Sequence, residues 1–344
     1  MQMTRWPRTG EVGCGVLMRS RAHRHRRSRV AHARLALLAT AALLAGGAAG
    51  GRAASGATPG AASASGGTGY VTSVVAAAGH IKSLPSGLVP ALQDAANDTG
   101  SVDLNQGGCN PATATTTVPS CTYGDTHASK TIVLIGDSHA QMWFPAFRQI
   151  ATQAHYKLVV LTKASCPAAD IDVYDYLRKK PYVECTKFHQ FEIARAKQLK
   201  PDILVLASLA RGIGLASSFH SAVSDSAWQA GLAKMLSAIP AKKKYIVGDI
   251  PFLGETGGPD CLAAHEGDVQ ACSASQSAAN SQLKVTAEQK AAAQAHATYI
   301  NTTPWFCAQS RCYAVVGKYD VYSDNAHITG AYSTFLARAL QSFL

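Results

Sequence analysis

Short apolar runs alternate with longer amphipathic stretches from residue 131 to the C-terminus. The runs at 131–135, 157–161, 203–207 and 244–248 have the pattern of strands buried on both faces. Helix-forming stretches occupy 140–155, 185–199, 226–239, 274–297 and 329–343, and 299–302 is predicted to be an edge strand. Strands that alternate with helices in this way predict an α/β fold, with one mostly parallel sheet in a single three-layer α/β/α domain.

The N-terminal third of the chain has a different composition. Residues 1–54 combine a basic run at 19–34, an apolar run at 35–45 and an exit of small residues, which is typical of a secretory signal peptide. The alternative is an uncleaved membrane anchor, but the apolar run is shorter than the roughly 20 residues that span a bilayer. Residues 55–104 are a linker rich in Gly, Ala and Ser followed by a weakly helical N-terminal extension. Residues 105–344 form the predicted domain, and its first part, 105–130, is expected to be loop.

The net charge of +11 is concentrated in the leader. Residues 1–54 hold 10 of the 32 basic residues and one of the 21 acidic residues, so 22 basic and 20 acidic residues remain, a net charge of +2. The positive charge therefore points to export and not to a nucleic-acid partner.

Eight cysteines lie outside the leader. An even number in an exported chain predicts disulfides, and many connectivities are open. Pairing each cysteine with its nearest neighbour is the simplest. A metal site is the less favoured alternative, because the sequence has no Cys-x-x-Cys and no histidine clustered with these cysteines. The candidates are Cys109, Cys121, Cys166, Cys185, Cys261, Cys272, Cys307 and Cys312.

The first apolar strand stops at Gly136, and a helix begins at once. Asp137 and Ser138 are residue types that cap helices, so Ser138 is expected at the carboxyl end of a strand and beside a helix N-terminus. Ligands bind at this edge of open α/β sheets, and the free N–H groups of the helix stabilise negative charge. We interpret Asp137 as a cap and His139 as a partly buried neighbour.

A second polar motif lies near the C-terminus. Asp324 precedes His327 by three residues, just before the last predicted helix. A nucleophilic serine needs a base, and the base needs a carboxylate that orients it. The alternative is a loop histidine that caps the last helix.

Two sequence blocks carry a family resemblance. Gly136-Asp137-Ser138-His139 and Asp324-x-x-His327 resemble the first and last blocks of the SGNH (GDSL-type) hydrolase family. Lys163-Ala-Ser-Cys-Pro167, Lys200-Pro-Asp-Ile-Leu-Val-Leu206 and the paired cysteines resemble a narrower group, the SGNH domain fused to type-3 (OafA/OatA-like) membrane acyltransferases. The resemblance covers roughly residues 105–344. It implies a flavodoxin-like SGNH hydrolase fold, with Ser138 as nucleophile, His327 as base and Asp324 as its orienting carboxylate.

The oxyanion donors depart from the general family pattern, which adds a glycine and an asparagine after the second and third strands. Residues 162–166 contain no glycine, and 208–212 contain no asparagine. The N–H of Ser138 is expected to remain one donor, with Ser165 and Ser208 as further candidates and Arg211 assisting. The SGNH domains fused to type-3 acyltransferases resemble this chain, because they also lack this glycine and this asparagine.

The resemblance implies an exported serine esterase or O-acyltransferase that acts on acyl esters of cell-surface glycan or peptidoglycan, with acetyl as the expected acyl group. The triad needs no cofactor, a separate membrane acyltransferase is a candidate acyl donor, and we expect a monomer. The alternatives are a lipase or carboxylesterase on free esters, and a non-catalytic glycan-binding wall module. Five aromatic residues are candidates for sugar stacking, although packing is the favoured reading: Trp143, Tyr174, Tyr176, Trp305 and Tyr322.

Overall fold

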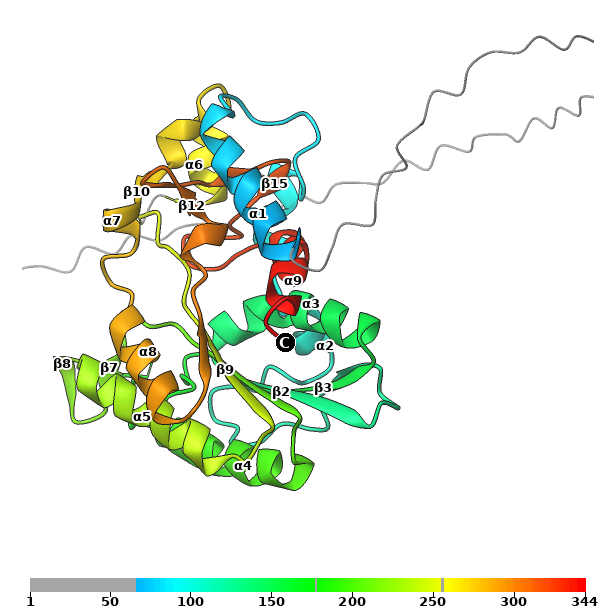
Figure 1. Ribbon diagram of the computed structural model, residues 1–344. Coiled ribbons are helices and arrows are strands. Elements are labelled where there is room, and N and C mark those ends of the chain that lie inside the picture. The colour runs from blue at the N-terminus through cyan, green and yellow to red at the C-terminus, as the bar shows by residue number, and fades with distance from the viewer. Residues whose placement is uncertain (1–65, 177, 255–256) are drawn as a thin grey trace, which may run out of the picture. The chain divides into compact units, whose positions relative to one another are not determined.

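The computed structural model describes residues 66–344 apart from residues 177 and 255–256, so the predicted signal peptide lies outside the described residues. At the centre is a six-stranded sheet with the order β1-β3-β2-β6-β9-β11 (Figure 1). Neighbouring strands are parallel, except that β1 runs antiparallel to β3. The predicted α/β class and mostly parallel sheet are confirmed. The strands are β1 (Thr122–Gly124), β2 (Lys130–Gly136), β3 (Tyr156–Thr162), β6 (Ile203–Ala207), β9 (Lys243–Val247) and β11 (Thr298–Ile300).

The central strands end in one row. Gly136 of β2 pairs with Thr162 of β3 and with Ala207 of β6, and Ala207 pairs with Val247 of β9. The apolar side chains of β2 at 132–135 are fully buried, as the continuous apolar run predicted. This register brings the loops that follow four strands to the same edge of the sheet.

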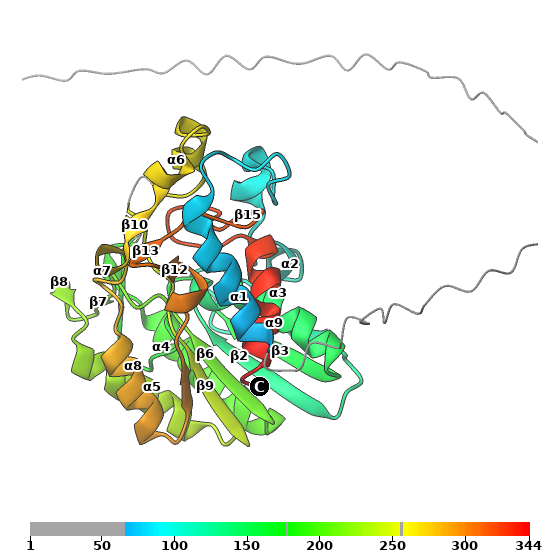
Figure 2. The same cartoon turned by 45° about the horizontal axis from the view of Figure 1, so that its top comes forward.

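Helices cover both faces of the sheet (Figures 1 and 2). Helices α3 (Ser138–Gln153) and α9 (Gly330–Gln341) pack together on one face, and α4 (Val183–Leu199) and α5 (Asp225–Ala238) cover the other. Helix α8 (Val285–Gln294) packs beside α5. Among the described helices, none is long and apolar enough to cross a membrane.

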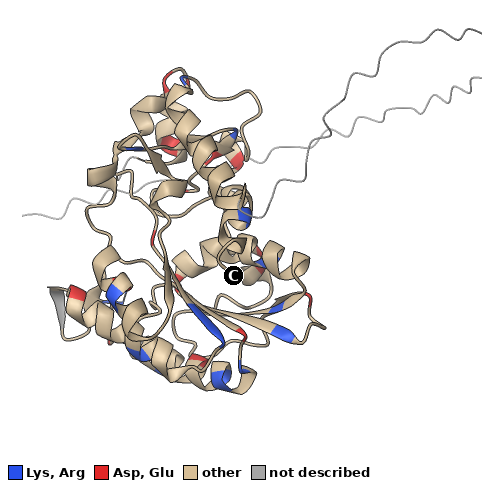
Figure 3. Ribbon diagram, in the orientation of Figure 1, with Lys and Arg blue, Asp and Glu red and all other residues tan. Residues whose placement is uncertain are grey.

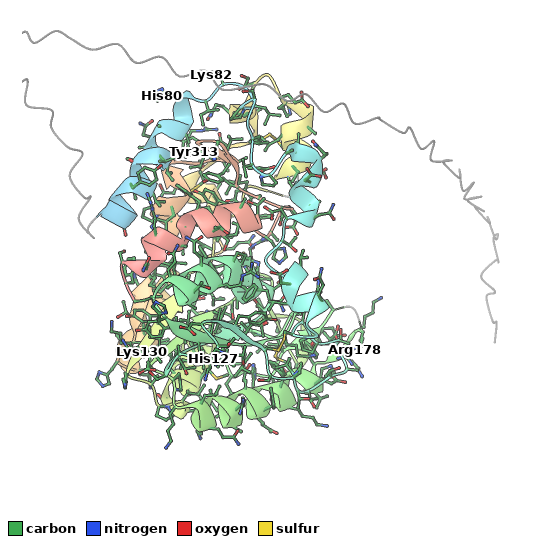
Figure 4. The ribbon with its side chains drawn as sticks, turned by 90° about the vertical axis from the view of Figure 1, so that its right-hand side faces the viewer. His80, Lys82, His127, Lys130, Arg178 and Tyr313 are labelled. Atoms are coloured by element: carbon green, nitrogen blue, oxygen red, sulfur yellow. A yellow bond between two sulfur atoms is a disulfide. The ribbon has the colours of Figure 1, made fainter. Side chains whose placement is uncertain are left out.

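The N-terminal extension packs on α9. Helix α1 (Gly66–Ala77) buries Val71 and Val75 in the same core as the sheet. A side chain at Gly67 would lie 2.3 Å from the carbonyl oxygen of Arg338, so the two helix backbones meet there. Past α1, a side chain at Gly79 would lie 3.1 Å from the hydroxyl of Tyr313, which is labelled beneath this segment in Figure 4.

Two predictions from the hydrophobic pattern are wrong. The stretch 274–297 is not one helix, because α7 (Gln276–Ala279) ends early and α8 begins only at Val285. Ser281 donates to the carbonyl of Ala278 and Asn280 donates to Thr303, and such bonds compete with helix propagation. The stretch before residue 131, expected to be loop, contributes β1, whose three residues are too few to show a strand period.

Acidic and basic residues are interspersed along the described chain (Figure 3).

Shorter helices and strands fill the connections between the main elements. They are η1 (Ala78–His80), η2 (Leu92–Asn97), α2 (Val102–Gln106), β4 (Tyr174–Asp175), β5 (Lys180–Pro181), β7 (Gly214–Leu215), β8 (Ser218–Ala222), α6 (Pro259–Ala264), η3 (Val269–Cys272), β10 (Ala274–Ser275), η4 (Thr303–Trp305), β12 (Cys307–Ala308), β13 (Arg311–Cys312), β14 (Val315–Val316) and β15 (Tyr319–Asp320).

Candidate active site

Ser138 is the first residue of α3 and lies at the carboxyl edge of the sheet. The chain reaches it through Gly136, which has a φ of 146°. A side chain at Gly136 would lie 1.8 Å from the carbonyl oxygen of Ala207, so only glycine fits between β2 and β6. The N–H of Ser138 is one of the groups that a helix leaves without an intrahelical acceptor.

Ser138, His327 and Asp324 form one hydrogen-bonded chain. The hydroxyl of Ser138 lies 2.9 Å from Nε2 of His327, and Nδ1 of His327 lies 2.8 Å from Oδ2 of Asp324. A carboxylate only accepts, so we assign the proton of the neutral imidazole to Nδ1, which leaves Nε2 to accept from Ser138. The sequence placed these three residues together, and the structure brings them together across 189 residues of chain.

The loop itself holds Asp324. Its Oδ1 accepts from the backbone N–H groups of Ala326 at 2.6 Å and His327 at 2.7 Å. Burial raises the pKa of Asp324, but hydrogen bonds and the charge of His327 outweigh burial and lower that pKa to about 2. Asp324 is therefore ionised throughout the neutral range. Its side chain is half exposed and that of His327 is 29% exposed, so the site is open to solvent.

Asp137 caps α3, as predicted, and also fixes a neighbouring loop. Its Oδ1 accepts from the N–H of His139 at 2.8 Å. Both of its carboxylate oxygens lie 3.1 Å from the N–H of Leu209, in the loop after β6. Burial raises the pKa of Asp137 to about 6. Asp137 therefore joins the Ser138 turn to the loop that forms the next part of the site.

A second His–Asp pair lies buried behind His327, and sequence reasoning missed it. His139, expected to be partly buried, is fully buried, and its Nδ1 lies 2.5 Å from Oδ1 of Asp249. Asp249 also accepts from the N–H groups of Ala210 and Ile250. Burial opposes charge on both groups, but their mutual attraction raises the pKa of His139 and lowers that of Asp249. We therefore treat the two as an ion pair.

The missed pair had one sequence signal. Asp249 follows a strand, at the edge where the polar loops of a parallel sheet gather. Nothing in the sequence assigns its partner, because the pairing with His139 depends on the strand order β2-β6-β9.

A small cavity opens beside Ser138. Its volume is about 120 Å³. Ser165, in the loop after β3, lines it together with apolar side chains, as does Gly212. The Ser165 loop is fixed on both sides: Lys163 donates to the carbonyls of Ala112 and Thr115, and Cys166 is joined to Cys185. The remaining lining residues are Asp137, Val173, Tyr174, Asp175, Tyr176, Leu209 and Ile213.

The other two candidate oxyanion residues do not line this cavity. Ser208 is buried, and its Oγ accepts from the N–H of Ala168 at 2.6 Å, so it joins two loops. The guanidinium of Arg211 lies 3.8 Å from the ring centre of Phe252 and lines a different cavity. The structure thus brings Ser138 and Ser165 together at the cavity and places Ser208 and Arg211 elsewhere.

Three of the five candidate stacking aromatics are packing residues. Trp143, Trp305 and Tyr322 are fully buried, so they offer no ring face to a sugar, and the favoured reading of packing is confirmed for them. Tyr174 and Tyr176 do line the cavity of Ser138, with ring centres 5.7 Å apart. Tyr176 is 46% exposed.

The cysteines pair with their nearest neighbours, as the simplest pairing predicted. One group of potential metal ligands is found among the described residues: Cys166, Cys185 and His189. The two sulfurs are bonded to each other, and Nε2 of His189 lies 2.8 Å from the carbonyl of Pro167, so this group does not offer thiolates. The disulfides are Cys109–Cys121, Cys166–Cys185, Cys261–Cys272 and Cys307–Cys312.

Comparison with known proteins identifies the family of the chain. Residues 108–342 match the family described as the SGNH domain fused to AT3 domains. The chain belongs to this SGNH family. Its acyltransferase-linked branch is the one that the sequence blocks indicated, and the match covers the described sheet, the Ser138 turn and the His327 loop.

The SGNH domain also has low-identity matches among solved structures. One is the periplasmic domain of a lipopolysaccharide acetyltransferase of Salmonella ser. Paratyphi A, with 17% identity and a TM-score of 0.46 over 62% of this chain and 83% of that chain. Another is Est24, a carbohydrate acetylesterase from Sinorhizobium meliloti, with 12% identity and a TM-score of 0.36 over 62% and 97%. No curated protein matches the sequence.

Proposed function

We propose that this SGNH domain is an extracytoplasmic serine esterase or O-acyltransferase that acts on acetyl esters of a cell-surface glycan or peptidoglycan. The observation that carries the proposal is the hydrogen-bonded chain from Ser138 through His327 to Asp324, which ends at a small cavity. Four disulfides and a basic leader with an apolar run support a location outside the cytoplasm.

The first half of the reaction transfers the acyl group to Ser138. As Oγ attacks the acyl carbonyl carbon, Nε2 of His327 takes the hydroxyl proton, and Asp324 stabilises the imidazolium. The N–H of Ser138 and the side chain of Ser165 are the proposed donors to the tetrahedral oxyanion. Collapse of this intermediate breaks the ester C–O bond, and His327 returns the proton to the leaving alcohol.

The second half releases the acyl group. Water or a sugar hydroxyl attacks the acyl-enzyme, His327 again takes the proton, and Ser138 leaves as its alcohol with that proton. Water as acceptor gives hydrolysis and free acid, whereas a sugar hydroxyl gives a new ester. Both reactions use the same residues, so the choice depends on the acceptor that occupies the open side of His327.

The size of the cavity favours a short acyl group. Beside Ser138, about 120 Å³ lies between Val173, Leu209 and Ile213. An acetyl group fits this space, whereas a long acyl chain does not, which argues against a lipase. Tyr174 and Tyr176 at the same cavity are the proposed contacts of the sugar that carries the ester. A separate membrane acyltransferase is the proposed donor for the transfer reaction, and we expect a monomer.

The deciding test compares p-nitrophenyl acetate hydrolysis by the purified protein and its variants. Ser138→Ala and His327→Ala are expected to abolish turnover, while His155→Ala, which changes an exposed histidine, is expected to retain it. p-Nitrophenyl octanoate is expected to be a much poorer substrate than the acetate. An unchanged rate in Ser138→Ala would overturn the proposal, and equal rates on both esters would favour a lipase.

A third result separates the binding-module alternative from a transferase. If folded protein hydrolyses no ester, we would label it with a phosphonofluoridate that modifies activated serines and locate the label by mass spectrometry. Labelling of Ser138 would support a transferase that needs its own donor. Absence of labelling would favour a non-catalytic module.

A further inference from the structure

A second cavity, which we call the α9 groove, lies apart from the Ser138 cavity and shares no lining residue with it. It has a volume of about 490 Å³ and runs beside α9, with walls from α1, α3 and β15. Helices α1, α9 and α3 lie side by side in both views (Figures 1 and 2). The residues that matter for its chemistry are Tyr70, Gln149, Lys318, Tyr319, Phe335 and Arg338.

Aromatic rings line the groove and continue into the core. The rings of Tyr319 and Phe335 are stacked with centres 4.8 Å apart, and Tyr70 meets Phe335 edge-on at 6.1 Å. Tyr332 packs behind Phe335 at 5.5 Å and donates its hydroxyl to the carbonyl of Trp305 at 2.5 Å. The buried Tyr332 ring therefore holds Phe335 in place, whereas the side chain of Tyr70 is 49% exposed.

Two cations lie against these rings. The guanidinium of Arg338 is 4.7 Å from the ring centre of Tyr70, and the ammonium of Lys318 is 5.7 Å from that of Tyr319. Among the described residues, neither cation is in an ion pair, and no acidic side chain lines the groove. The backbones of Gly67 and Arg338 approach closely, and Tyr70 lies three residues further along α1, beside Arg338. The groove thus carries positive charge that the described part of the protein does not neutralise.

This combination matches one class of ligand. Ring faces suit the apolar faces of sugar rings, the amide of Gln149 suits hydroxyl groups, and Lys and Arg suit a carboxylate or phosphate. A lipid surface would need a broad apolar patch, but Tyr70 is the one large exposed apolar side chain of the described residues at this groove. We propose that the α9 groove binds an anionic polysaccharide, one whose sugars carry carboxylate or phosphate groups.

The α9 groove lies near enough to the triad for one polymer chain to contact both. Helix α9 begins three residues after His327, and Arg338 lies eight residues further on, which is about 12 Å along a helix. A chain bound along α9 would be held close to Ser138 while its esters react there. The proposal rests on the proposed function only for this last step, because binding in the groove does not require catalysis.

The test measures binding and catalysis separately. Polygalacturonate serves as the anionic polysaccharide, dextran as a neutral one and polyglutamate as a polyanion without sugar rings. Affinity electrophoresis of the purified, disulfide-bonded protein is expected to show retardation by polygalacturonate only. Lys318→Gln/Arg338→Gln is expected to weaken that binding about tenfold or more, because the polymer loses two cationic partners for its anionic groups. Hydrolysis of p-nitrophenyl acetate is expected to stay unchanged.

Two further variants keep the proposal falsifiable. Lys187→Gln/Lys290→Gln removes the same charge at exposed positions away from the groove and is expected to leave binding within about twofold of the parent, as surface charges contribute little. Tyr70→Leu is expected to weaken polygalacturonate binding severalfold through loss of ring contact. Equal losses in both charge variants, or equal retardation by polyglutamate with no effect of Tyr70→Leu, would overturn the proposal in favour of unspecific ion exchange.

Discussion

The rings of His139 and His327 lie 5.0 Å apart, tilted by 57°, although one follows the nucleophile and the other belongs to the C-terminal loop. His139 is in turn anchored to Asp249 at 2.5 Å. His327 therefore lies between two carboxylates. Asp324 is hydrogen-bonded to it directly, and Asp249 is separated from it by the ring of His139. His139 is a positioning residue in this arrangement, since it contacts the base and not the cavity of Ser138.

The first prediction concerns this buried pair. His139→Leu is expected to lower the free energy of unfolding by about 3 kcal/mol, because Asp249 would remain as a buried charge without its partner. His139→Leu/Asp249→Leu is expected to recover part of that loss, because removing both partners leaves no uncompensated buried charge. Urea unfolding of the single and double variants checks this. Independent, additive losses would contradict the coupling.

A catalytic readout separates positioning from stability. At a temperature where all variants stay folded, His139→Leu is expected to reduce kcat for p-nitrophenyl acetate with little change in KM, because His327 loses the ring that fixes its tilt. His155→Ala, which changes an exposed histidine paired with Asp125, is the matched control and is expected to leave kcat unchanged. A full kcat in folded His139→Leu would assign His139 a purely structural role.

The second prediction concerns Asp324. Asp324→Asn is expected to reduce kcat about 10²-fold, a smaller loss than the ~10⁴ seen when a buried triad aspartate is replaced, because the Asp324 side chain is half exposed. The amide also presents its NH₂ group to Nδ1, which disfavours the tautomer that accepts from Ser138. Single-turnover kinetics with p-nitrophenyl acetate measure the acylation step. A loss as large as that of Ser138→Ala would contradict the expectation that exposure limits the contribution of this carboxylate.

The sequence predicted the parts of the site that local pattern determines. The strand that stops at Gly136, the cap at Asp137 and the Asp324-x-x-His327 loop are each encoded within a few residues, and the strand alternation predicted that they meet at one sheet edge. The pairing of His139 with Asp249 was not predictable, because it spans 110 residues and depends on strand order.

The limits of the sequence reading also have local physical causes. Aromatic residues near the site look alike in sequence whether they pack or face solvent, so packing was the favoured reading for all five, and Tyr176 could not be told apart from Trp143, Trp305 and Tyr322. The prediction of one helix at 274–297 was wrong because the Ala-rich composition gives no sign that a helix ends near Asn280, whose side chain donates a hydrogen bond to Thr303.

The third prediction concerns the disulfide next to Ser165. Replacing Cys166 and Cys185 by alanine is expected to destabilise the protein by about 3 kcal/mol and to lower kcat as well, because the Ser165 loop loses one of its two anchors. The matched control replaces Cys307 and Cys312, which close a loop remote in sequence from Ser165. That variant is expected to lose stability and keep its kcat when folded. Equal effects on kcat would remove the link between this disulfide and the cavity.

The fourth prediction concerns the pH dependence of stability. Asp320 is fully buried, and the backbone N–H of Tyr322 offsets only part of the effect of burial on its carboxylate. Burial raises its pKa from 3.8 to about 7. The folded protein therefore keeps this proton up to about pH 7, whereas the unfolded chain releases it near pH 4. Between these values the folded state binds more protons, so this group makes the free energy of unfolding fall as pH rises.

Asp320→Asn removes this titratable group and is expected to reduce the fall in the free energy of unfolding as pH rises. The variant should gain stability relative to the parent as pH increases from 4 to 7, whatever its absolute stability at any one pH. Urea unfolding at intervals across this range gives the slope directly. The comparison of slopes also excludes the packing cost of the amide, because that cost does not change with pH. Parallel curves for variant and parent would mean that Asp320 ionises at the same pH in the folded and unfolded states.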